Sequence, residues 1–146
     1  MLLAWLAWPA SSAAQCDPVD DIRFICDLIG PEDLAIVPGD DWVIASGNQE
    51  GGRLHAVHVR DKTTMVLFPT DTRVERHDAT RYPTCPGPLD LADPNAFRAH
   101  GLYLAPGSDA THTLYIVHHG TRESIEVFDV DAGQSPPSLI WVGCAV

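Results

Sequence analysis

The chain alternates short apolar runs with polar segments rich in turn-forming residues. The runs Leu102–Ala105 and Leu114–Val117 flank Pro106-Gly107-Ser108-Asp109, a composition typical of a turn, so this stretch predicts a β-hairpin. The nearest candidate for an amphipathic helix is Asp17–Leu28, whose apolar spacing fits a lead-in strand equally well. We therefore expect an all-β protein.

The hairpin pattern occurs twice along the chain. The segment PEDLAIVPG at 31–39 aligns without gaps with AHGLYLAPG at 99–107. Each copy continues with three further short apolar runs, at 42–46, 53–59 and 64–68 in the first and at 114–118, 124–130 and 138–142 in the second. A repeated four-stranded meander is typical of β-propeller blades. The pattern predicts one blade at 31–68 and a second at 99–146, joined by a proline-rich loop at 69–98.

The N-terminus has the character of a targeting segment. Residues 1–14, MLLAWLAWPASSAA, are apolar, too short to span a bilayer and end in small residues, although the usual basic start is missing. We interpret 1–14 as a signal peptide and 15–30 as a leader segment. The mature protein is then periplasmic or extracellular, with no membrane association after cleavage.

The charge balance narrows the choice of partner. The formal net charge is −11, and the few Lys and Arg residues are scattered, which excludes nucleic acid as a favoured partner. Most of the acidic residues fit a solvated surface, and the alternative is that some carboxylates converge on a cation. The 12 Pro and 11 Gly residues suit a turn-rich all-β chain.

The four cysteines, Cys16, Cys26, Cys85 and Cys144, contain no CxxC pair, which disfavours a structural zinc site. In an exported protein we expect one or two disulfides, and spacing leaves all three pairings open. A buried free thiol is the alternative for Cys144, which lies in an apolar run.

Glu32 and Asp33 are adjacent carboxylates at the start of the first repeat. In an extended backbone they point to opposite faces, so they would serve two different ions rather than chelate one. Hard oxygen ligands favour calcium or magnesium, and calcium accepts irregular loop geometry. The alternative is an acidic pair that only forms a turn or caps the strand.

Three histidines flank the second hairpin. His100 precedes the first strand, and His118 and His119 follow the second, so antiparallel pairing brings them to the same end. Consecutive strand residues face opposite ways, so only one of His118 and His119 shares a face with His100. A histidine dyad acting as general base fits this geometry, zinc bound by all three fits it less well, and ordinary surface histidines are the alternative.

Three motifs in register then resemble the paraoxonase (arylesterase) family, within the senescence-marker, gluconolactonase and strictosidine-synthase-like propellers. They are PEDLAI, the segment AHGL that contains His100, and TLYIVHHG followed by ESIEVFDV. The resemblance covers roughly residues 25–144, in the same order.

The resemblance implies a calcium-dependent six-bladed β-propeller that hydrolyses lactones and aryl esters. It implies that Glu32 ligates a catalytic calcium, and that Asp33 and the carbonyl of Leu102 ligate a structural calcium. It assigns His100 and His119 to a catalytic dyad, with His118 standing where the family carries asparagine.

The same resemblance implies that two blades of six are present and that the remaining calcium ligands lie beyond Val146, so the segment alone is expected to be inactive. The expected partner is a small ester or lactone, and the sequence does not indicate an oligomeric state. The alternative function is a non-catalytic propeller that binds a ligand or a protein, because one fold hosts many functions.

Overall fold

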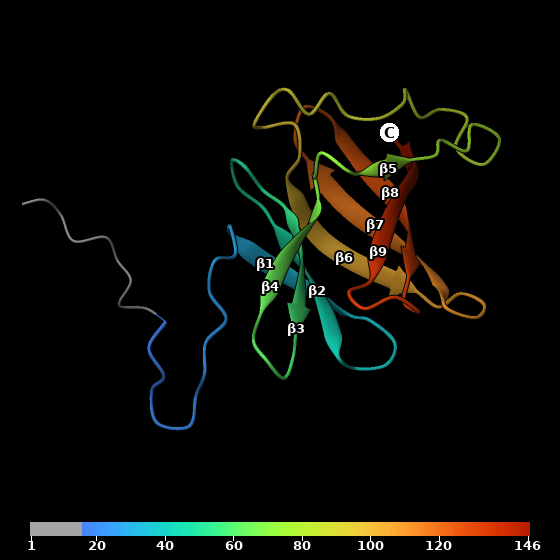
Figure 1. The fold of residues 1–146 in the computed structure, drawn as a ribbon. Coiled ribbons are helices and arrows are strands. Elements are labelled where there is room, and N and C mark those ends of the chain that lie inside the picture. Colours follow the sequence, from blue (N-terminus) through green and yellow to red (C-terminus); the bar gives the residue numbers. More distant parts are fainter. Residues whose placement is uncertain (1–15) are drawn as a thin grey trace, which may run out of the picture.

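The computed structural model describes residues 16–146, which form two β-sheets and contain no α-helix (Figure 1). The predicted signal peptide therefore lies outside the described residues. The first sheet is an antiparallel meander with strand order β1-β2-β3-β4. Its strands are β1 (Pro31–Ile36), β2 (Trp42–Gly47), β3 (Leu54–His58) and β4 (Thr64–Phe68). The prediction of an all-β chain is confirmed.

The second sheet has five strands rather than the four predicted. Its meander consists of β6 (Ala99–Ala105), β7 (Thr111–His119), β8 (Glu123–Asp131) and β9 (Ser138–Ala145). The added strand, β5 (Val74–Glu75), lies in the connecting loop and pairs in parallel with β9, which gives the order β5-β9-β8-β7-β6. Two residues carry no visible alternation, so the sequence pattern does not reveal β5.

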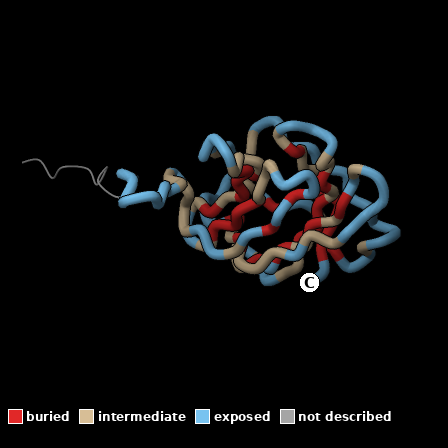
Figure 2. The backbone as a smooth tube through the Cα atoms, turned by 90° about the horizontal axis from the view of Figure 1, so that it is seen from below, coloured by how far each residue is buried: buried red, intermediate tan, exposed pale blue. Residues whose placement is uncertain are grey.

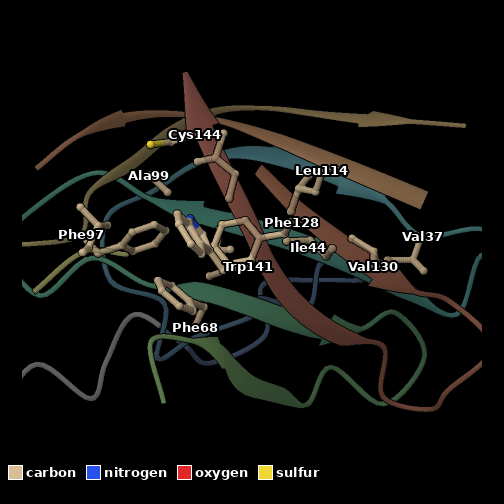
Figure 3. Packing of buried hydrophobic residues seen from close by; sticks show 14 of the residues in the cluster. Val37, Ile44, Phe68, Phe97, Ala99, Leu114, Phe128, Val130, Trp141 and Cys144 are labelled. Atoms are coloured by element: carbon tan, nitrogen blue, oxygen red, sulfur yellow. The ribbon is translucent and has the colours of Figure 1, made fainter. Parts of the chain in front are cut away.

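The hydrophobic core lies between the two sheets. Phe68 of β4 packs edge-on against Phe97 and Phe128, with ring centroids 4.8 and 5.0 Å apart, and Trp141 of β9 lies in the same cluster (Figure 3). Each of these four side chains is at most 4% exposed. Burying one large apolar side chain is worth roughly 1.5–3 kcal/mol, so this cluster holds the two sheets together. Figure 2 shows the buried positions gathered in the interior of the molecule and the exposed ones around its periphery.

The sequence repeat has a counterpart in backbone geometry. The pairing of β1 with β2 shifts register between Pro31 and Leu34, and the pairing of β6 with β7 shifts between Ala99 and Leu102. These are the positions that align in the two copies. A β-bulge re-aims the side chains beside it, so both copies direct the residues at their strand starts in the same way.

At equivalent positions of the two copies, one side chain faces the core between the sheets and the other faces away from it. Ala35 is buried between the sheets, whereas Tyr103, its equivalent, is 62% exposed. Leu34 is 63% exposed, whereas its equivalent Leu102 packs against the core. The two sheets therefore stack front to back, in the manner of successive units of a repeat, and not face to face.

The N-terminal leader and the long loop are both fixed by disulfides. Cys16 pairs with Cys26, and Cys85 of the loop pairs with Cys144 of β9, so the alternative of a free thiol at Cys144 is wrong. The segment considered as a helix, 17–28, forms only an isolated bridge between Val19 and Ile22. Within residues 16–146, no helix is long and apolar enough to cross a membrane.

Candidate functional site

His100 and His119 meet at one end of the second sheet. Ala99 of β6 lies opposite His118 of β7, so the first residues of β6 lie beside the last residues of β7. The Nδ1 atom of His100 is 3.2 Å from Nε2 of His119, which places the two imidazoles in direct hydrogen-bond contact. The backbone amide of His119 donates to the carbonyl of Arg98 at 3.0 Å and fixes the strand at this point.

A carboxylate contacts each outer end of this histidine pair. Glu32 Oε1 of β1 lies 2.8 Å from Nε2 of His100. Glu123 Oε2 of β8 lies 2.5 Å from Nδ1 of His119. The four side chains form a continuous chain, Glu32–His100–His119–Glu123, drawn from both sheets. All four are partly solvent-exposed, so a small molecule can reach them.

Asp33 points away from this chain and ties β1 to β6. Its Oδ2 accepts a hydrogen bond from the amide of Leu102 at 2.7 Å, and its Oδ1 accepts one from the amide of Leu34 at 2.8 Å. The amide of Asp33 donates to Ser46 Oγ at 2.9 Å, and Ser46 Oγ in turn donates to the carbonyl of His100 at 2.6 Å. Glu32 and Asp33 thus have separate surroundings, and Asp33 lies beside Leu102.

His118 lies on the opposite face of β7 and is fully buried. Its Nε2 is 2.8 Å from the carbonyl of Ala96 and its Nδ1 is 2.8 Å from the carbonyl of Arg122. Burial, and to a smaller extent the charge of Arg122, lowers the pKa of His118, while the hydrogen bonds to the Ala96 and Arg122 carbonyls and the charge of Glu126 act in the opposite direction. Because its ring nitrogens contact these carbonyls, His118 does not join His100 and His119 in a zinc site.

A buried ion pair supports the turn that follows His119. Glu126 is fully buried and accepts hydrogen bonds from Arg122 Nε at 2.8 Å, Ser124 Oγ at 2.6 Å and Trp141 Nε1 at 2.7 Å. Arg122 Nη1 also donates to the carbonyl of Gly87 in the long loop at 2.7 Å. A buried carboxylate is tolerated when its partners satisfy it in this way. The network holds the chain on either side of Glu123.

The oxygen donors at this end of the molecule are of the type that calcium binds, but they are fewer than a calcium site needs. Glu32, Asp33 and the Leu102 backbone supply hard oxygen ligands, whereas calcium takes about 6–8 oxygens. Within residues 16–146, no three His, Cys, Asp or Glu side chains form a group arranged for a metal ion. The residues described here fit part of a calcium site, so further oxygens would be needed to complete one.

A shallow cavity of about 290 Å³ opens beside Asp33 on the outer face of the second sheet. Most of its lining is apolar and comes from β6, β7 and β8, including Leu102, Tyr103, Tyr115, Val117 and Ile125. The cavity therefore offers an apolar surface next to a carboxylate.

Glu123 and Ser46 belong to the site and were not predicted from the sequence. Glu123 lies directly opposite His119 in the pairing of β7 with β8. The short turn GTR after His119 is the signal that indicates this neighbour, because a tight hairpin places the next strand's first residue opposite the last residue of the preceding one. Ser46 has no comparable sequence signal, since its contacts join two separate sheets.

Comparison with protein-family models, with curated proteins and with solved structures finds no significant match for this chain.

Proposed function

We propose that these residues form part of a calcium-dependent hydrolase of lactones and aryl esters, built as a six-bladed β-propeller. The observation that carries the proposal is the contact of His100 with His119, 3.2 Å apart, with the carboxylate of Glu32 on the outer nitrogen of His100. Two linked imidazoles at a solvent-accessible sheet end are suited to general base catalysis near neutral pH.

The front-to-back stacking of the sheets supports the propeller. Ala35 and Tyr103 are equivalent in the repeat, and only the first is covered by another sheet. Repeating the same stacking step would cover the face of Tyr103 with a third sheet. Continued repetition closes a ring of blades and removes the exposed apolar faces.

Glu32 is the residue proposed to hold a catalytic calcium, and Asp33 with the Leu102 carbonyl a structural one. The separate surroundings of the two carboxylates support this division, because Asp33 is tied to Leu102 and Glu32 reaches His100. When bound, calcium supplies polarisation of the ester carbonyl and stabilises the developing negative charge on its oxygen. The remaining oxygen ligands are proposed to come from residues outside 16–146.

The chain's own contribution to the reaction is proton transfer and positioning. With Glu32 engaged by calcium, Nε2 of His100 would be the atom that takes a proton from the attacking water, while Nδ1–H of His100 donates to Nε2 of His119. The apolar cavity beside Asp33 is suited to the hydrocarbon part of a lactone or aryl ester. The two disulfides support an exported protein, because such bonds persist in oxidising compartments.

The proposal is tested by measuring hydrolysis of an aryl ester and a lactone by the protein from the complete gene, before and after chelation. We expect chelation to abolish activity, added calcium to restore it, and Glu32→Gln to lower the rate well below that of the control Glu50→Gln. Glu50 is exposed and lies in the connection between β2 and β3. Activity that survives chelation and the Glu32 change would overturn the calcium assignment.

A non-catalytic ligand-binding propeller is the second candidate. It is favoured by the exposure of the histidine pair and by the small number of metal ligands within residues 16–146. Calcium-dependent binding of a lactone without its turnover would select this function over hydrolysis.

A further inference from the structure

Among residues 16–146, Glu123 is the one carboxylate in contact with His119, and its position follows from the sheet. His119 ends β7, Glu123 begins β8, and the two residues are paired across the strands. Glu126, the next carboxylate along β8, is fully buried and occupied by Arg122, Ser124 and Trp141. Glu123 therefore contacts His119 without competition from its nearest acidic neighbour.

The contact between Glu123 and His119 decides which nitrogen of His119 carries hydrogen. A carboxylate accepts hydrogen bonds, so Nδ1 of His119 must donate to Glu123 across the 2.5 Å contact. A neutral imidazole has one N–H, so Nε2 of His119 then carries a lone pair. That lone pair faces Nδ1 of His100 at 3.2 Å.

The tautomer of His119 in turn sets the tautomer of His100. An acceptor at Nε2 of His119 favours N–H at Nδ1 of His100, and a neutral His100 then carries its lone pair at Nε2. With the other tautomer of His119, Nε2–H would face His100, the hydrogen of His100 would move to its Nε2, and that atom could no longer accept a proton. Glu32 Oε1 lies 2.8 Å from this Nε2 and, as an acceptor, favours hydrogen on it, so Nε2 of His100 would be free to act as a base when Glu32 ligates the proposed calcium instead.

We propose that Glu123 is a positioning residue that fixes the tautomers of the histidine pair, so that the functional unit is Glu123–His119–His100. This inference rests on the proposed function for its catalytic meaning. Glu123 does not touch the reacting atoms, and it acts only through His119. The same logic operates wherever a carboxylate orients a catalytic imidazole through its second nitrogen.

The test combines ring-nitrogen NMR with kinetics on the full-length protein labelled with ¹⁵N at histidine, using Glu123→Ala, Glu123→Gln and the control Glu50→Ala. The His119 signals are assigned by their loss in His119→Gln. In the unaltered protein and in the control we expect hydrogen on Nδ1 of His119. In Glu123→Ala we expect a mixture of both tautomers, and in Glu123→Gln, whose amide oxygen still accepts, a state close to the unaltered one.

The kinetic effect is expected to be modest, because Glu123 is largely exposed and an exposed pair is worth about 0.2–1 kcal/mol. We expect kcat to fall about two- to fivefold in Glu123→Ala, with Glu123→Gln in between. An unchanged His119 tautomer in Glu123→Ala would overturn the inference, and so would an unchanged kcat in a protein that hydrolyses esters. If the protein hydrolyses none, the proposed function fails and the NMR result still decides whether Glu123 orients His119.

Discussion

Asp33 of the first sheet accepts a hydrogen bond from the backbone amide of Leu102 in the second, over 2.7 Å. This bond joins the bulged starts of β1 and β6, which are equivalent in the sequence repeat. It places Glu32, the neighbour of Asp33, within reach of His100, the residue two before Leu102. The site is thus assembled by the packing of one repeat on the other.

Asp33→Asn is expected to lower the free energy of unfolding by about 1–3 kcal/mol, because an amide replaces the carboxylate that accepts two backbone N–H bonds. Thermal or urea unfolding measures the loss. Asp71→Asn, on the exposed part of the long loop, serves as the control and should change stability little. Equal stability of Asp33→Asn and Asp71→Asn would contradict the role of Asp33 as a tie between sheets.

His118→Ala is expected to destabilise the protein by about 2–4 kcal/mol, since it removes a buried ring and the N–H that donates to the carbonyl of Ala96 or of Arg122. His118→Asn should cost less, because the amide can still donate to one of these carbonyls. Denaturant unfolding of both variants provides the comparison. An unchanged free energy of unfolding in His118→Ala would show that these buried contacts do not contribute to stability.

His55 of β3 is 4% exposed, and neither ring nitrogen has a hydrogen-bond partner within residues 16–146. Burial, followed by the charge of Arg53, lowers the pKa of His55 below its usual 6.5 in the folded protein. The unfolded chain therefore binds more protons below pH 6.5, so stability falls as the pH drops through 6.5 towards the folded value.

His55→Leu is expected to raise stability at neutral pH and to reduce this loss between pH 6.5 and lower pH. Unfolding free energies measured from pH 8 down to about pH 5 test the change, with the exposed His77→Leu as the control. An unaltered pH dependence of stability in His55→Leu would mean that His55 has the same pKa in the folded and the unfolded protein.

The disulfide between Cys85 and Cys144 anchors the long loop to β9. Replacing both cysteines by serine is expected to cost about 2–4 kcal/mol of stability and to loosen the loop. Limited proteolysis should then cut between residues 69 and 98 before it cuts the strands. Cleavage that starts elsewhere would indicate that other contacts, such as the hydrogen bond from Arg122 to the carbonyl of Gly87, suffice to hold this segment.

The sequence predicts the meander strands well because their apolar runs and Pro-Gly turns are local signals. The same signals predict that His100 meets one of His118 and His119, and only the family resemblance singles out His119. Strand β5 could not be predicted because two residues show no periodicity. The hydrogen-bond contacts of buried His118 could not be predicted either, because the Ala96 and Arg122 carbonyls lie outside its own strand. Ser46 escapes because its partners, Asp33 and His100, meet only when the sheets pack.

His100 and His119 are proposed to act as one unit, and a double-mutant comparison of lactone hydrolysis measures this coupling. We measure kcat for His100→Gln, His119→Gln and the double variant of the full-length protein in saturating calcium, with stability checked in each. We expect each single variant to lose most of the activity and the double variant to be scarcely worse than either. Losses that multiply in the double variant, or single variants that retain full activity, would contradict this coupling.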